Sequence, residues 1–227
     1  MLNHSQTGDE LQSLNVVFDW GRSLSEGSVV SAQSTQSPSR QSAGSCVLNR
    51  NCPEDHFSFF VQSGAANVVA PKICIQDKLV LGSVLNNAGF GINIVVMNGE
   101  LRSVNGCFLF VLVPHTEVFV FNRSNRRDVK PLIKLLESIE KGSAVLMASY
   151  DDPSSKLSED ARKLIAELGS STVQSLGFRD NWVFVGGKGA TVKSNFEKYM
   201  KNDNAKNKYQ NWPELVELQG CIPKYLE

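Results

Sequence analysis

Three polar residues beside apolar runs are the main candidates for chemistry in this chain. Asp151 and Asp152 follow the apolar run SAVLMAS, and Arg179 stands in the motif GFRDNW just before another apolar run. A planar cation, a carboxylate and the aromatic face of Trp182 are groups with which proteins bind a sugar or a carboxylate. The structural alternative is an ion pair from Arg179 to Asp151 over a core Trp182.

Other patterns for catalysis or cofactor binding are weak. Asp151 and Asp152 can serve as an acid/base pair at a strand end, but Asp-Asp-Pro is also ordinary turn chemistry. The three histidines match no metal-ligand spacing, and the GxSxG motif of a serine hydrolase is absent. GGKGAT has Trp182 where a P-loop needs its first glycine. We therefore expect no catalytic residue, no metal site and no cofactor.

Apolar periodicity predicts the elements that hold these residues. GINIVVMN at 91–98, SAVLMAS at 143–149 and WVFVGGK at 182–188 are predicted buried strands. Between them, a helix over 128–138 repeats apolar residues at helical spacing. A second helix begins at the N-cap Ser158 and ends before Gly169.

This alternation of strands and helices favours a parallel sheet with helical crossovers. The short runs SFFVQSG at 58–64 and ICIQDKLVLG at 73–82 favour antiparallel hairpins in the first half. The residues alone therefore predict a mixed α and β fold, with the sheet topology left open.

Charge and composition limit the classes of partner. The chain has 227 residues with 23 basic and 23 acidic side chains, and this balance gives no electrostatic footprint for nucleic acid. No apolar run reaches the roughly 20 residues that span a bilayer, since Pro114, His115 and Glu117 interrupt the longest one, at 107–121. Nine serines between Arg22 and Ser45 predict a disordered stalk over 1–45, followed by one folded domain over 46–227.

The five cysteines bear on the cellular compartment. Those near the two ends of the predicted domain suggest disulfides formed in an oxidising compartment, and the alternative is scattered buried thiols. No secretory leader follows Met1, so we expect a secreted form to take its leader from sequence outside this chain. The sequon Asn122-Arg123-Ser124 permits glycosylation of a secreted chain.

Several long segments resemble the secreted, cytokine-like ILEI (interleukin-like EMT inducer) family. The resemblance covers about 46–101 and 128–223 and implies an α+β fold, a globular β-β-α domain in which two facing antiparallel sheets are flanked by short helices. That implication overrules the parallel sheet. The segments are SGAANVVAPKICIQDK, INIVVMNG, VLMASYDDPSSKLSEDARKLIAELGS, LGFRDNWVFVGGKG and NKYQNWPELVELQGCIP.

The resemblance implies a secreted, extracellular signalling protein and not an enzyme. Its activity would be that of a cytokine that binds a cell-surface receptor and acts in epithelial to mesenchymal transition or metabolic regulation. A similar module in the stem of a glycosyltransferase implies the alternative, a lectin-like carbohydrate-binding module. Asp151 and Arg179 match polar residues of that module's cavity, and Trp182 would add an apolar wall.

The resemblance also implies disulfides Cys46–Cys74 and Cys52–Cys221, with Cys107 unpaired. Phe90 stands where the family has an arginine, which removes a cation from the expected ligand site. Val185 stands where the family pattern has a cysteine, so a homodimer of this chain would need other contacts.

The chain also departs from the family in one long segment. Residues 102–127 replace a shorter family stretch. We expect 107–121 to form an extra strand pair at a sheet edge or an exposed apolar loop.

Overall fold

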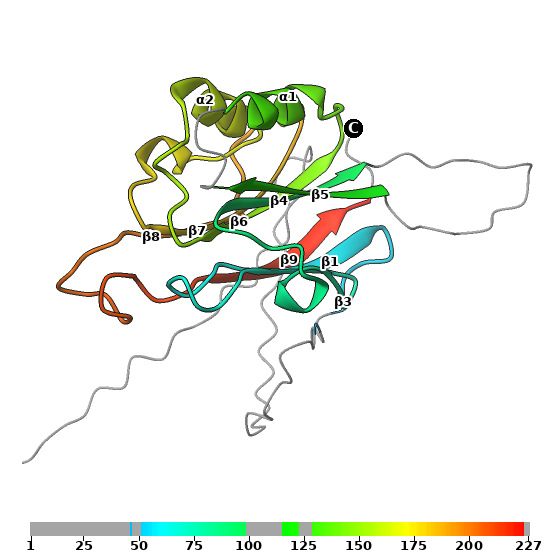
Figure 1. Cartoon of the computed structure of the whole chain (residues 1–227). Helices are drawn as coiled ribbons and strands as arrows, with labels where there is room; N and C mark the ends of the chain where they lie inside the picture. The colour runs from blue at the N-terminus through cyan, green and yellow to red at the C-terminus, as the bar shows by residue number, and fades with distance from the viewer. Residues whose placement is uncertain (1–45, 47–50, 99–114, 123–128, 225–227) are drawn as a thin grey trace, which may run out of the picture.

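Two antiparallel β-sheets and two short α-helices make up the fold (Figure 1). The computed structural model describes residue 46 and residues 51–98, 115–122 and 129–224. The four-stranded sheet has the order β3-β2-β1-β9, with β1 His56–Gln62, β2 Lys72–Ile75, β3 Lys78–Leu81 and β9 Glu217–Pro223. The five-stranded sheet has the order β5-β4-β6-β7-β8, with β4 Gly91–Asn98, β5 His115–Asn122, β6 Ala144–Tyr150, β7 Asn181–Gly187 and β8 Glu197–Met200. The helices are α1 Lys130–Ser138 and α2 Glu159–Glu167, and two 3-10 turns are η1 Ser83–Leu85 and η2 Val173–Ser175.

The five-stranded sheet is covered on both faces (Figure 1). Leu146 and Ala148 of β6 join the apolar cluster shared with the four-stranded sheet, whereas Val145 and Met147 join the cluster under α1 and α2. A strand with two covered faces needs an apolar residue at nearly every position. This is why SAVLMAS reads as a continuous apolar run and not as an alternating one.

The sheets confirm the antiparallel arrangement, and the parallel sheet suggested by the strand and helix alternation is wrong. β4 pairs antiparallel with both β5 and β6, so β5 and β6 run parallel with β4 between them, and α1 joins the two. α2 then joins β6 to β7, its antiparallel neighbour. Periodicity located β4, β6, β7 and both helices, but it did not predict β8 or β9, and it carries no information about which strands become neighbours.

The ends of α2 lie where the sequence predicts them. The Ser158 side chain accepts a hydrogen bond from the Ala161 amide at 3.2 Å, which satisfies one free N–H group of the first turn. Gly169 follows the last turn with φ of 105°, a left-handed conformation that glycine adopts without a Cβ clash.

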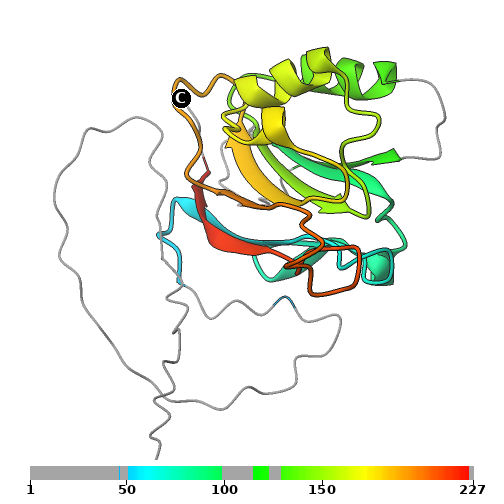
Figure 2. The same cartoon turned by 90° about the vertical axis from the view of Figure 1, so that its left-hand side faces the viewer.

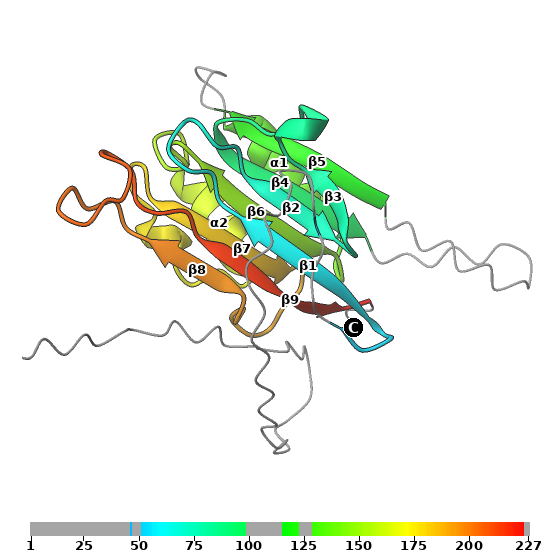
Figure 3. The same cartoon turned by 90° about the horizontal axis from the view of Figure 1, so that it is seen from below.

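Both predicted disulfides are present, and they lie on either side of β1. Cys46 is bonded to Cys74 of β2, and Cys52 is bonded to Cys221 of β9. Figure 3 shows β2, β1 and β9 side by side, with β1 in the middle. Because Cys46 and Cys52 are only six residues apart, the two bridges fix the beginning of the domain to both neighbours of β1.

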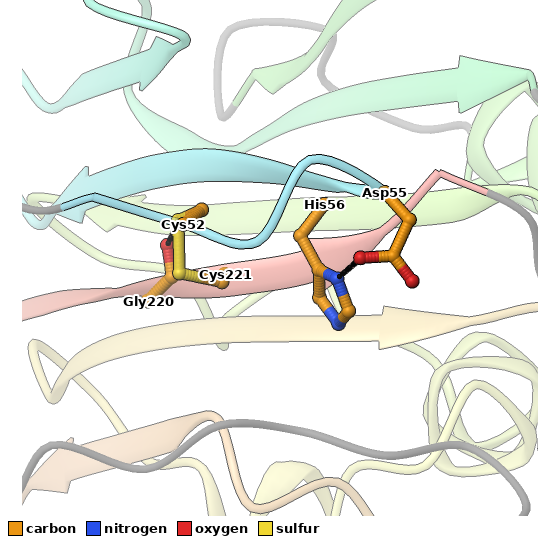
Figure 4. Close-up of a disulfide and its surroundings, with 5 residues drawn as sticks. All are labelled: Cys52, Asp55, His56, Gly220 and Cys221. Atoms are coloured by element: carbon orange, nitrogen blue, oxygen red, sulfur yellow. Dashed lines mark hydrogen bonds and ion pairs between the residues drawn. A yellow bond between two sulfur atoms is a disulfide. The ribbon is translucent and has the colours of Figure 1, made fainter.

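The Cys52–Cys221 disulfide lies where β1 begins and β9 ends (Figure 4). Next to it, the His56 Nδ1 lies 2.7 Å from the Asp55 Oδ1, and this hydrogen bond holds the pKa of Asp55 below its usual value. This end of the four-stranded sheet is therefore closed by a covalent bond and a polar pair.

Residues 115–122 of the segment that departs from the family pattern lie within the described residues. His115–Asn122 forms β5, which pairs with β4 along all eight residues at one edge of the five-stranded sheet. The expectation was a strand pair at a sheet edge or an exposed loop, and the described residues contain one edge strand of this segment. The predicted stalk 1–45, Cys107 and the rest of 107–121 lie outside the described residues.

Candidate functional site

Five connecting segments meet at one end of the two sheets, and we call this end the loop end. Pairing places the end of β1 beside the starts of β2 and β9, and the end of β6 beside the start of β4. The Gly64 amide donates to the Ser149 carbonyl at 2.8 Å, so the same ends of both sheets coincide. Figure 2 looks onto this end, which lies on the left in Figure 1. Its segments are residues 63–71, 82–90, 151–153, 176–180 and 201–216.

Asp151 and Arg179 both lie at the loop end with strained backbone. Asp151 directly follows β6 with φ of 59°, and Arg179 precedes β7 with φ of 60°. Left-handed conformations cost non-glycine residues of the order of 1–3 kcal/mol and cluster at functional sites. Seven described non-glycine residues have positive φ; two form the β2–β3 turn, and the other five lie at the loop end, namely Ala66, Asn86, Asp151, Arg179 and Gln210.

Trp212 joins the two predicted site residues. The Arg179 guanidinium carbon lies 4.0 Å from the centre of the Trp212 ring and 4.8 Å from that of Phe178. The Trp212 Nε1 donates to the Asp151 Oδ1 at 3.1 Å. The Arg179 Nε is buried, with no hydrogen-bond partner among the described residues. The result is a cation stacked on aromatic rings beside a carboxylate.

Trp182 does not take the role predicted for it. Its side chain has 0% exposure, packs in the cluster under the helices and donates from Nε1 to the Glu197 Oε1 at 2.8 Å. The aromatic residue that contacts both Arg179 and Asp151 is Trp212, which the ligand-site prediction did not include. A signal existed: Trp212 stands in the polar stretch NKYQNWPE, where no apolar periodicity requires a core tryptophan.

Phe90 contributes an aromatic contact in place of the expected arginine. Phe90 is 39% exposed, and the centre of its ring lies 4.8 Å from the centre of the Tyr150 ring. The Tyr150 hydroxyl donates to the Asn67 carbonyl at 3.1 Å. Burial, together with the charge of Asp151, raises the pKa of Tyr150 above its usual value. Phe90 and Tyr150 thus extend the aromatic surface of the loop end.

Asp180 holds the turn that presents Phe178 and Arg179. Its carboxylate accepts from the Gly177 amide at 2.6 Å, the Tyr199 hydroxyl at 2.7 Å and the Asn202 amide at 2.7 Å. Burial and the hydrogen bond to Asp180 raise the pKa of Tyr199 to about 12. The aspartate of GFRDNW is therefore a positioning residue; in this turn Phe178 is exposed and Arg179 is partly exposed.

Asp152, the lysine of GGKGAT (Lys188) and the nearby Lys193 have structural partners. The Asp152 Oδ1 accepts from the Ser154 amide and hydroxyl, both at 3.1 Å, as turn chemistry predicts. The Lys188 Nζ donates to the Leu136 carbonyl of α1 at 3.0 Å, and the Lys193 Nζ donates to the Ser170 carbonyl beyond α2 at 3.1 Å. Both lysines satisfy carbonyls at or beyond the carboxyl ends of the helices.

The sequence also singled out Asn122 as a glycosylation site and Val185 for its bearing on a homodimer. Asn122 is the last residue of β5, and the other two residues of its sequon lie outside the described residues. Val185 is buried between the two sheets. Within the described part of the chain, no group of three or more histidine, cysteine or acidic residues is placed to hold a metal ion. No helix there is long and apolar enough to cross a membrane.

Known proteins similar to this chain share most of its length. The family described as Interleukin-like EMT inducer matches residues 90–190. Protein FAM3C of Danio rerio is 49% identical over 186 residues, which cover 82% of this chain and 77% of that protein. Protein FAM3C of Homo sapiens is 46% identical over 193 residues, covering 85% and 78%. Protein FAM3A of Mus musculus is 47% identical over 179 residues, covering 79% and 73%.

The chain belongs to the interleukin-like EMT inducer family. This confirms the resemblance seen in its sequence. The family match contains Phe90, Asp151 and Arg179, whereas Trp212 lies beyond residue 190. Trp212, the aromatic partner of Arg179, lies in the segment that leads into β9.

Proposed function

We propose that this chain is a secreted, cytokine-like signalling protein that acts through a cell-surface receptor. The observation that carries the proposal is the 46–49% identity to FAM3 proteins over about four fifths of the chain, in a family described as an inducer of EMT. The process would be epithelial to mesenchymal transition or metabolic regulation. In this proposal the chain is not an enzyme, and a homodimer is formed without the cysteine that Val185 replaces.

Two structural features support the extracellular part of the proposal. The Cys46–Cys74 and Cys52–Cys221 bridges fit a protein that folds in an oxidising compartment. They also fix both ends of the domain, which suits a ligand that must keep its shape outside the cell.

The test is to secrete the full 227-residue chain behind a heterologous leader and apply the purified protein to cultured epithelial cells. We expect loss of epithelial junctions and increased migration at nanomolar to micromolar doses. The same protein after reduction and alkylation serves as the control, since it lacks the bridged fold. If cells given protein with intact disulfides look and migrate like untreated cells at every dose, the proposal is contradicted.

A lectin-like carbohydrate-binding module is the second candidate, favoured by the Arg179 stack on Trp212 beside Asp151. The missing arginine at Phe90 would cost one charge-assisted hydrogen bond, about ten- to a hundredfold in affinity. We expect Phe90→Arg to improve binding of an N-acetylglucosaminide in an NMR titration and Arg179→Ala to abolish it again. Equal shifts in all three proteins would rule out a sugar at this position.

A further inference from the structure

The edge strands of the two sheets differ in how they are protected against pairing with another strand. An edge strand carries a row of unpaired backbone N–H and C=O groups, and proteins shield such rows with short strands, lysine, proline or bulges. The edge strands are β3 and β9 of the four-stranded sheet and β5 and β8 of the five-stranded sheet. Three of these four described edges have such protection, and β5 does not.

β3, β8 and β9 are each protected by their length or their sequence. β3 and β8 have only four residues each, and each contains an exposed lysine, Lys78 in β3 and Lys198 in β8. The pairing of β3 with β2 is also interrupted by a register shift. β9 is longer, but it begins with the exposed Glu217 and ends with Pro223, which has no N–H to offer a further strand. These three edges are therefore poor templates for pairing.

β5 has none of these devices in its own sequence. His115–Asn122 contains no lysine, arginine, proline or glycine, and apart from His115 its only ionisable side chain is that of Glu117. All eight residues pair with β4 in one unbroken register, so the outer side of β5 has an equally long and regular row of backbone groups. No described strand pairs with that outer side, and Figure 3 shows β5 at the rim of its sheet, beyond β4.

Apolar side chains flank this edge on both faces of the sheet. Val118 is 37% exposed, and Phe119 and Val120 are partly buried. Val118 lies opposite Val95 of the cluster between the sheets, whereas Phe119 packs against the cluster under the helices. Successive residues of a strand point to opposite faces, so a strand added beside β5 would cover apolar surface on both faces.

A second copy of β5 matches this edge in length and in charge. A two-fold axis perpendicular to the sheet pairs the two strands antiparallel and places opposite one another only residues that share a face. Because β5 has eight residues, the longest such registers pair seven of them and are centred on Val118 or on Phe119. In both registers Glu117 lies opposite a phenylalanine and never opposite its own copy. The strand is thus self-complementary, with no like charges opposed and with valine opposite valine at position 118.

We infer that β5 is the homodimer interface of this chain, with the β5 strands of two copies paired antiparallel in one continuous sheet. The inference rests on the homodimer included in the proposed function, and it names the surface that forms it. Val185 stands at the position of the family's cysteine, so the interface is non-covalent. Because both copies use the same strand, neither retains a free β5 edge, and assembly stops at two.

The two edges of the five-stranded sheet offer a matched pair of substitutions. Val118 of β5 and Met200 of β8 are both 37% exposed, and both lie on edge strands. Lysine on an edge strand opposes pairing with another strand. In the proposed dimer, Val118→Lys puts a lysine into the interface twice, once from each copy, whereas Met200→Lys lies at the far edge of the sheet.

The first experiment is sedimentation velocity of the full 227-residue chain over a range of concentrations. Every protein also carries Cys107→Ser, so that no free thiol at this position can link two copies. We expect a reversible dimer with and without Met200→Lys, and a dimer dissociation constant at least about tenfold higher with Val118→Lys. Thermal unfolding checks that each variant is folded.

Single cysteines test the same interface without weakening it. A residue on the two-fold axis lies opposite its own copy with the Cβ atoms about 4.5–5.5 Å apart, close enough for a disulfide after a small shift. We therefore expect either Val118→Cys or Phe119→Cys to give a disulfide-linked dimer on a non-reducing gel, according to the register. Met200→Cys is the control and should give none.

The outcomes separate this inference from the proposed signalling function. A chain that acts on epithelial cells but is monomeric at every concentration refutes the inference alone. A dimer linked through β5 that has no effect on cells refutes the signalling function alone. A dimer weakened equally by both lysine substitutions, cross-linked only by Met200→Cys, or replaced by larger assemblies overturns the inference, as does a monomer whose β5 amides on both sides are protected from hydrogen exchange.

Discussion

The two ends of the five-stranded sheet use their polar residues in different ways. At the loop end, Arg179 stacks on Trp212 and Phe178 with strained backbone, and its buried Nε has no described hydrogen-bond partner. At the opposite end, which we call the anchored end, Lys188 and Lys193 donate to carbonyls at or beyond the ends of the helices. The Cys52–Cys221 disulfide lies at the same end of the four-stranded sheet. A motif whose polar atoms are already hydrogen-bonded within the fold contributes to stability, whereas one presented on strained turns is available to a partner.

Removing the Cys52–Cys221 disulfide should give the largest loss of stability. Its sequence separation is 169, against 28 for Cys46–Cys74, and the chain-entropy estimate gives about 5 and about 3.5 kcal/mol. We expect the double variant Cys52→Ser/Cys221→Ser to lose more free energy of unfolding than Cys46→Ser/Cys74→Ser. Urea denaturation of both measures this. Equal losses would show that the length of the closed loop does not govern the stabilisation.

Replacing Glu197 with alanine should cost roughly 3 kcal/mol, since it leaves several partly buried donors without an acceptor. Its carboxylate accepts from Trp182 Nε1, the Ser170 and Thr172 hydroxyls and the Ser171 amide and hydroxyl. Glu214→Ala is the control, because Glu214 forms an exposed pair with Lys208, and such pairs contribute about 0–1 kcal/mol. Similar costs for both variants in urea denaturation would contradict the role given to Glu197.

The Glu197 network also predicts a pH dependence. Burial acts to raise the pKa of Glu197, but the hydrogen bonds from Ser170, Ser171 and Trp182 outweigh it and lower the pKa from 4.5. Its stabilisation is therefore complete above the unfolded value and is lost as pH falls through the folded pKa. We expect wild-type stability to decrease below about pH 4.5, with a smaller decrease in Glu197→Gln.

The sequence predicted the elements well because each is specified locally. The N-cap Ser158, the glycine at 169 and the apolar spacing of both helices depend on neighbours within a few residues. The order of the strands depends on contacts between distant segments, so the alternation of strands and helices gave the wrong sheet. The disulfides followed from the resemblance, since five cysteines alone leave the pairing open.

The site was predicted in part for the same reason. Asp151 and Arg179 stand next to predicted strand ends, and the structure brings both to the loop end. Trp182 lies in the same motif as Arg179, yet strand alternation turns it into the core beneath the helices. Trp212 takes its place beside Arg179 from 33 residues further along the chain, a contact that no local pattern encodes.

Lys188→Met should have a smaller effect at the anchored end, about 1 kcal/mol, because one carbonyl of the last turn of α1 loses its donor. The control is Lys201→Met, an exposed lysine at the loop end for which we expect less than about 0.5 kcal/mol. Melting temperatures of the two variants test the difference. A greater loss in Lys201→Met would reverse the comparison between the two ends.

We expect the smallest effect on stability from Arg179→Gly. The informative quantity is the difference in free energy of unfolding between Arg179→Gly and Arg179→Ala. Both variants lose the stack on Trp212, worth about 0.5–1 kcal/mol, but only glycine relieves the left-handed strain at φ of 60°. We therefore expect Arg179→Gly to be at least as stable as Arg179→Ala. At Lys188, which is not among the residues with positive φ, the order should be reversed, with alanine more stable by up to about 1 kcal/mol. Urea denaturation of the four variants gives both orders. If alanine were the more stable replacement at both positions, the backbone at Arg179 would carry no strain, and the contrast between a strained loop end and an unstrained anchored end would fail at the residue on which it most depends.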